Sequence, residues 1–271
     1  MSELRIEQRI AERQDALSPQ ERRAAATLVD HLDDLATYRA AELADLAGVS
    51  KATMSRLFRS LGYADFDEVR AHLRALREAG EPRRLDGPPD LGAHAEAEGE
   101  LVRRALAQPR LDDAVALVAD AARVTVLGWR SGYPVALHLR QQLAHARGDV
   151  RLAPAPGQVL GEEIADLTAG DVAVVLGFRR RPAGFGALLA AVHDTGATVL
   201  LVADRTASMH AHHADLWLEC PVETRLAFDS YAGAMSLVGV LADGVLSHLG
   251  APARRRAAAI SATYARLGEV E

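Results

Sequence analysis

Cysteine, lysine and aromatic residues are scarce in this chain of 271 residues. The sole cysteine, Cys220, excludes an internal disulfide framework and fits a reducing compartment. Aromatic residues make up 4% of the chain, so Ala, Val and Leu must build most of the core. Lys51 is the sole lysine, and every other basic residue is arginine. Because arginine is so common, only an arginine in an unusual position counts as a functional signal.

Two further features are missing from the sequence. The first residues, MSELRIEQRIAERQ, are charged and lack the apolar stretch of a secretory signal. No run is expected to approach the roughly 18 apolar residues that a membrane span requires, which predicts a cytoplasmic protein without a membrane partner. The net charge of −6 excludes a protein coated in basic surface but leaves room for a local basic site.

Residues 1–80 have the pattern of short helices. The run SPQE at 18–21 is typical of a helix start, with Ser18 as N-cap, Pro19 in the first turn and Glu21 as capping-box partner. Further helices are predicted from about 40 to 46, from Ser50 to a stop at Gly62, and from about 65 onward.

A polar run rich in Gly and Pro, GEPRRLDGPPDLG, follows at 80–92 and predicts a linker over 81–92. Beyond it, short apolar runs predict strands at 123–128, 171–177, 197–204 and 215–220. Helical stretches alternate with these runs, at 131–147, 183–194 and 224–249, and a last one lies at 252–267. The alternation predicts a parallel sheet with helices on both faces. The predicted fold is therefore an all-α domain over 1–80 and a doubly wound α/β domain over 93–271.

The stretch ELADLAGVSKATMSRLFRSLGY, residues 42–63, has the spacing of a helix-turn-helix, with Gly48 in the turn. In that motif the second helix enters the major groove of DNA with its N-terminal residues facing base edges. From 46 to 64 the chain has three basic side chains and no acidic one. The predicted DNA contacts are Ser50, Lys51, Thr53, Met54, Ser55, Arg56 and Arg59. Two helices of a small bundle with a solvated basic face are the alternative interpretation.

The segment AAELADLAGVSKATMSRLFRSLGYADFDEVRAHL resembles the N-terminal domain of RpiR-type bacterial transcription regulators, and the resemblance covers residues from about 18 to 76. It implies that the second domain is a sugar-isomerase (SIS) domain, which in such regulators senses a small ligand and dimerises. The expected protein is a transcription regulator, not an enzyme, that binds double-stranded operator DNA and needs no cofactor. Because an operator has two half-sites, we expect a homodimer or homotetramer.

Two loops that follow predicted strands are candidate ligand sites: GWRSGY at 128–133 and GFRRRP at 177–182. Ligands of open α/β sheets bind outside the carboxyl ends of the strands, and each loop leads into a helix N-terminus that favours an anion. The resemblance implies hydroxyl-bearing G-x-G-x-S and S-x-S-G-x-T loops at these places. Aligned without gaps, Arg130 falls on the second glycine of the first motif, and Arg179 and Arg180 fall on a serine and the glycine of the second. These departures argue against a standard sugar-phosphate ligand.

The arginines in these loops have two interpretations that the sequence leaves open. Arg130, Arg179 and Arg180 replace the hydroxyls with charge-assisted contacts to a carboxylate or phosphate. Alternatively, they form salt bridges at an interface or lie in solvent. Ser131 and Ser230 are further candidates for hydroxyl contacts to a small anionic effector.

Other functions are considered and not favoured. His210, His212 and His213 lack a second cluster with metal-ligand spacing, so no metal site is expected. Glu162 and Glu163 would supply a general base if the protein were a sugar-phosphate isomerase-like enzyme with an added helical domain, which is the main alternative. A third possibility is that the N-terminal helices bind another protein, and the acid-free basic helix argues against it.

Overall fold

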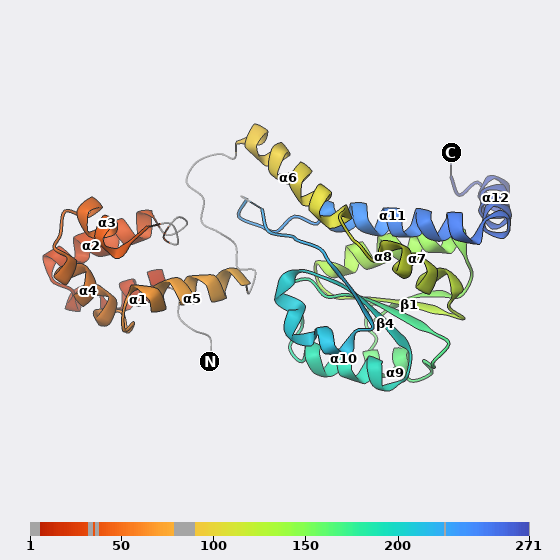
Figure 1. The fold of residues 1–271 in the computed structure, drawn as a ribbon, viewed down its shortest axis with the longest axis horizontal. Helices are drawn as coiled ribbons and strands as arrows, with labels where there is room; N and C mark the ends of the chain where they lie inside the picture. Colours follow the sequence, from red (N-terminus) through yellow and green to blue (C-terminus); the bar gives the residue numbers. More distant parts are fainter. Residues whose placement is uncertain (1–5, 32–34, 36–37, 79–89, 225, 271) are drawn as a thin grey trace. The chain divides into compact units, whose positions relative to one another are not determined.

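A computed structural model describes residues 6–31, 35, 38–78, 90–224 and 226–270. The chain divides into two compact units, Met1–Pro88 and Pro89–Glu271 (Figure 1). Residues 81–89 of the predicted linker lie outside the described residues, whereas residues 91 and 92 begin a helix capped by Asp90. The bounds of the linker therefore stay a prediction.

The described part of the first unit is helical, as predicted. The capping box of Ser18 is present: its amide donates to Glu21 Oε2 at 2.9 Å, and its hydroxyl accepts from the Glu21 amide at 3.3 Å. Gly48 and Gly62, at φ +60° and +88°, form the predicted turn and stop, because glycine adopts this backbone readily. The helices are α1 (Ile6–Arg13), the 3-10 helix η1 (Gln14–Ala16), α2 (Pro19–Asp30), α3 (Ala40–Leu46), α4 (Lys51–Ser60) and α5 (Phe66–Glu78).

The second unit contains a five-stranded parallel sheet of order β2-β1-β3-β4-β5. In the sheet, β1 lies between β2 and β3. The connection that follows β1 leads to β2 on one side, whereas the connection that follows β3 leads to β4 on the opposite side, so the two connections diverge between β1 and β3. Gly128 of β1 pairs with Leu176 of β3, which brings the loops that follow these strands together. The strands are β1 (Val124–Gly128), β2 (Val150–Ala153), β3 (Val172–Leu176), β4 (Thr198–Ala203) and β5 (Leu216–Glu219).

Both faces of the sheet are buried, which confirms the predicted fold class. Within β3, Val172, Val174 and Leu176 face one core, whereas Ala173 and Val175 face the other. The alternation of side chains between the two faces does not show in the sequence, because a strand buried on both faces is apolar at every position. Figure 1 shows the two helical layers: one contains α6 (Leu91–Leu106), α7 (Leu111–Asp120), α8 (Gly132–Ala146) and α11 (Ala232–Leu249), and the other contains α9 (Leu160–Ile164) and α10 (Phe185–Asp194).

The predicted helix over 224–249 is wrong at its start, since α11 begins at Ala232. Residues before it form local side-chain hydrogen bonds that compete with a helix. The Thr224 hydroxyl donates to the Phe228 carbonyl at 3.1 Å, and the Ser230 hydroxyl accepts from the Ala232 amide at 3.2 Å. The sequence patterns also missed β2, α6 and α7, whereas the predicted last helix is present as α12 (Ala251–Leu267).

Helix α11 corrects the expectation that no run reaches the length of a membrane span. Its 18 residues are long and apolar enough to cross a membrane by length and composition alone. However, seven of its residues, including Leu237, Leu241 and Val245, are buried against the domain core. The helix is therefore apolar because it packs against α6, α7 and α8 in the core of the second unit.

Candidate nucleic-acid interface and ligand-binding edge

Helix α4 turns a basic stripe outward and an apolar stripe inward. The Ser50 hydroxyl accepts from the Thr53 amide at 3.1 Å and so caps the helix, as predicted. Lys51, Ser55, Arg56 and Arg59 are exposed, which fits one face of a helix. These side chains are accessible for contact with a phosphate or a base edge.

Two of the predicted DNA contacts point the other way. Met54 and Thr53 are each 1% exposed, and Met54 lies in the core of the first unit beside Leu57 and Phe58. The Thr53 hydroxyl lies 2.9 Å from the Ser50 hydroxyl and is shared with the cap. We therefore correct both assignments: Met54 anchors α4 in its core, and Thr53 orders the first turn.

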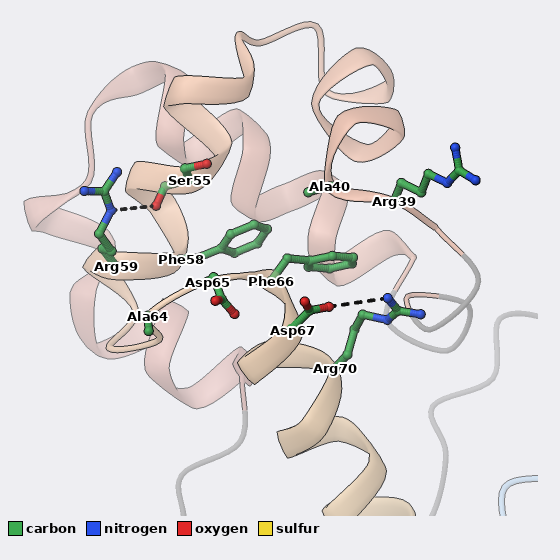
Figure 2. Close-up of a pocket in the computed structure, with 10 residues that line it drawn as sticks. All are labelled: Arg39, Ala40, Ser55, Phe58, Arg59, Ala64, Asp65, Phe66, Asp67 and Arg70. Carbon is green, nitrogen blue, oxygen red and sulfur yellow. Dashed lines mark hydrogen bonds and ion pairs between the residues drawn. The ribbon is translucent and has the colours of Figure 1, made fainter.

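A hollow beside α4 adds one residue that the sequence patterns missed. Figure 2 shows Phe58 and Phe66 inside this hollow, with Arg59 projecting at one end and Arg39 at the other. Arg39 is exposed at the start of α3, where its amide donates to Glu42 Oε2 at 2.7 Å. In a helix-turn-helix the first helix crosses the DNA backbone, so Arg39 is a candidate phosphate contact. In the sequence, the position of Arg39 one residue before α3 could have identified it as a candidate contact.

The second candidate site lies at the carboxyl ends of β1 and β3. Arg130 and Arg180 are exposed there, and their backbones have φ of +51° and +63°. Among the described residues, only Asp149 is a further non-glycine with positive φ. Such backbones are uncommon for residues with side chains and gather at ligand sites. The edge where connections diverge therefore carries two strained, exposed arginines on neighbouring loops.

Arg179 takes a different position from the one predicted. Its guanidinium is largely buried and forms a bidentate ion pair with Asp229, with Nε 3.1 and 3.0 Å from the two carboxylate oxygens. Its amide donates to Asp204 Oδ1 at 2.5 Å. Although burial lowers the pKa of Arg179, the hydrogen bonds and charge of Asp229 raise it above its ordinary value overall. In this structure Arg179 therefore makes an internal salt bridge, and its contact with an effector stays a prediction.

The remaining candidates also have partners inside the chain. The Ser230 hydroxyl donates to Glu98 Oε2 of α6 at 2.7 Å, so its proton is already used in a hydrogen bond within the second unit. Ser131 is exposed, and its side chain lies near the Tyr231 hydroxyl. Burial raises the pKa of Tyr231, and the nearby Ser131 hydroxyl opposes this effect.

Arg181 was not predicted as a site residue. Its guanidinium donates to the Gly177 carbonyl at 2.8 Å and to Asp204 Oδ1 at 3.2 Å. It also donates to the Thr206 hydroxyl at 2.7 Å. Arg181 therefore ties the loop after β3 to the loop after β4.

The residues considered for an isomerase-like reaction or a metal site do not form a common site among the described residues. Glu162 is exposed, and Glu163 Oε1 accepts from the Ala155 amide at 3.2 Å. His210 lies in the 3-10 helix η2 (Arg205–His213), where burial, and then the charge of Arg181, lower its pKa. Within the ranges that the structure describes, no group of three or more His, Cys, Asp or Glu could hold a metal ion.

Comparison with known families assigns both units. Residues 4–77 match the helix-turn-helix domain of the rpiR family, and residues 117–243 match the SIS domain. The first match contains α4, and the second contains the edge with Arg130 and Arg180. A comparison with curated proteins finds no match.

Solved structures share the fold of the chain. The sugar isomerase domain of an RpiR transcription factor from Sphaerobacter thermophilus matches with a TM-score of 0.55 at 22% identity, over 64% of this chain and 96% of that chain. The NanR protein of Vibrio vulnificus, solved in complex with ManNAc-6P, matches with a TM-score of 0.59 at 17% identity, over 97% and 99% respectively. At these identities the likeness establishes the fold alone.

Proposed function

We propose that this RpiR-type regulator, which joins an RpiR-family helix-turn-helix domain to a SIS domain, binds operator DNA and responds to a small anionic metabolite. The effector would be a sugar phosphate, a sugar acid or a compound of similar charge. Two operator half-sites require paired DNA-binding domains, so the working form is a homodimer or homotetramer in the cytoplasm.

The exposed pair Arg130 and Arg180 carries the effector proposal. They follow neighbouring strands at the place where ligands of doubly wound sheets bind. A guanidinium binds a carboxylate or phosphate with two parallel hydrogen bonds, and its charge does not titrate at physiological pH. Two such groups on adjacent loops favour an anion with at least two acceptor oxygens over a neutral sugar.

The effector is tested by thermal-shift screening of sugar phosphates, sugar acids, dicarboxylates and neutral sugars. We expect an anion to stabilise the wild type and to change its affinity for duplexes selected from a random-sequence pool. The variant Arg130→Gln/Arg180→Gln should lose about 1–3 kcal/mol of anion binding and keep its DNA affinity, because each lost contact involves a charged group. Fluorescence anisotropy measures the DNA affinity.

The matched control changes the same charge elsewhere in the second unit. Arg254→Gln/Arg255→Gln removes two exposed arginines of α12 and should respond to the anion as the wild type does. If both double variants lose the response equally, general electrostatics explain it and the loop arginines do not bind the effector. A response to a neutral sugar that survives in all three proteins would overturn the anionic class.

The DNA interface is tested by single substitutions on the exposed face of the first unit. Arg56→Ala should weaken binding to the selected duplex by about 1–3 kcal/mol and relax the preference at one base pair, if its guanidinium reads guanine. Lys51→Ala and Arg39→Ala should weaken all duplexes evenly and lower the salt slope by about 0.9 for each lost phosphate contact. Arg23→Ala, an exposed arginine of α2, is the control. Wild-type binding by the first three variants would remove this face from the interface.

A further inference from the structure

Three consecutive residues before α11 connect three different parts of the second unit. Asp229 pairs with Arg179 in the loop after β3, and Ser230 bonds Glu98 on α6. Tyr231 lies near Ser131 after β1, and the centroid of its ring is 5.4 Å from that of Phe178 in the loop after β3. The segment 229–231 therefore joins the ligand-binding edge to α6, the first described helix after residue 89.

The Asp229 carboxylate occupies a position suited to a ligand anion. It binds the Arg179 guanidinium in the bidentate manner of a bound carboxylate or phosphate. Arg179 lies three residues beyond the end of β3, at the edge where the connections diverge. The side chain of Arg179 is 9% exposed, and that of Asp229 is 13% exposed. The pair is thus largely shielded from solvent, so an anion reaches the guanidinium only if the Asp229 carboxylate moves aside.

We propose that Asp229 is a built-in competitor that fills a binding site for a carboxylate or phosphate group at Arg179, and that an anionic effector displaces it. This inference rests on the proposed function and adds the internal competition that regulates the same site. Exchange keeps Arg179 paired throughout, which matters because an arginine left buried without a counter-charge is strongly unfavourable. The released Asp229 carboxylate is largely buried in its present position, so it must move outward with segment 229–231 to be solvated by water.

Displacement has a defined structural consequence. Ser230 follows Asp229 directly, so movement of the carboxylate away from Arg179 also moves the hydroxyl that binds Glu98. Glu98 lies one turn after His94, whose Nε2 is 3.8 Å from Glu98 Oε1. Loss of the Ser230 contact loosens the N-terminal half of α6. An event at the ligand-binding edge thereby reaches the helix that follows the predicted linker.

The test uses inorganic phosphate as the probe and isothermal titration calorimetry of the full chain. If the Asp229 carboxylate occupies the site in about nine-tenths of the molecules, the apparent affinity for phosphate is about tenfold weaker than that of an open site. We therefore expect Asp229→Asn to bind phosphate at least about tenfold more tightly than the wild type. The double variant Arg179→Gln/Asp229→Asn should lose this gain because the guanidinium is absent.

The matched control is Asp166→Asn, which makes the same change in net charge. Asp166 pairs with Arg123, and Arg123 keeps its second partner, Asp171, at 2.7 Å. This variant should bind phosphate like the wild type. Equal affinity in the wild type and Asp229→Asn overturns the proposal, and so does a gain that persists without Arg179 or appears in Asp166→Asn.

A second measurement on the wild type keeps the test decisive if Asp229→Asn does not fold. Saturating phosphate should speed amide hydrogen exchange in segment 226–232 and in the first half of α6, as mass spectrometry would record. Unchanged or slower exchange in both segments overturns the proposal. Neither readout involves DNA or the natural effector. The proposed function fails separately, if no anion in the screen changes DNA affinity.

Discussion

Replacing Arg179 by alanine should lower the free energy of unfolding of the second unit by about 3–5 kcal/mol, because it leaves the Asp229 carboxylate largely buried without its counter-charge. Urea unfolding followed by tryptophan fluorescence measures this loss. Both tryptophans of the chain, Trp129 and Trp217, lie in the second unit, so their emission reports on that unit alone.

Two variants separate charge burial from general damage to the loop. Arg180→Ala removes the neighbouring exposed arginine and should change stability by no more than about 0.5 kcal/mol. Arg179→Ala/Asp229→Ala removes both charges and should be more stable than Arg179→Ala alone. If the double variant is the less stable of the two, the buried carboxylate is not the cause of the loss.

Replacing Met54 by alanine should destabilise the first unit by about 2–5 kcal/mol, since a fully buried side chain is cut back in the core beside Leu57 and Phe58. Met54→Leu keeps the volume and should cost less than about 1.5 kcal/mol. Helical circular dichroism during urea unfolding follows both units, and tryptophan fluorescence identifies the transition of the second, so the remaining transition is that of the first.

DNA binding by Met54→Leu decides what Met54 does. Met54→Leu should bind the selected duplex with wild-type affinity, because the residue does not reach the surface of α4. A loss of affinity in Met54→Leu, with stability preserved, would restore Met54 as a DNA contact and contradict its position in the core.

Features set by neighbouring residues could be predicted from the sequence. The capping box of Ser18, the turn at Gly48 and the cap at Ser50 each depend on side chains within a few residues of one another. The strands β1, β3 and β4 were recognisable because continuous apolar runs are typical of a sheet buried on both faces. The short edge strand β2 has one exposed residue and one buried one, so it carried no such signal.

The candidate site depended on contacts that are distant in sequence. Arg179 and Asp229 are 50 positions apart, and Ser230 and Glu98 are 132 apart, so neither pairing shows in a local pattern. The loop sequence correctly marked a cluster of arginines at the edge of the sheet. It could not distinguish the exposed Arg180 from the buried Arg179, because that difference depends on where the segment before α11 returns.

The position of Lys51 allows binding at α4 to be detected through the amine of this one side chain. It is the sole lysine in the chain, and it lies exposed at the first position of α4. Apart from the α-amino group, an amine-directed label can therefore attach at that one place. A fluorophore coupled to Lys51 would sense whatever contacts α4, and acylation of the same amine would remove a positive charge from that helix. Slower labelling of the Lys51 amine would therefore report that a partner covers α4, and the measurement needs no engineered residue.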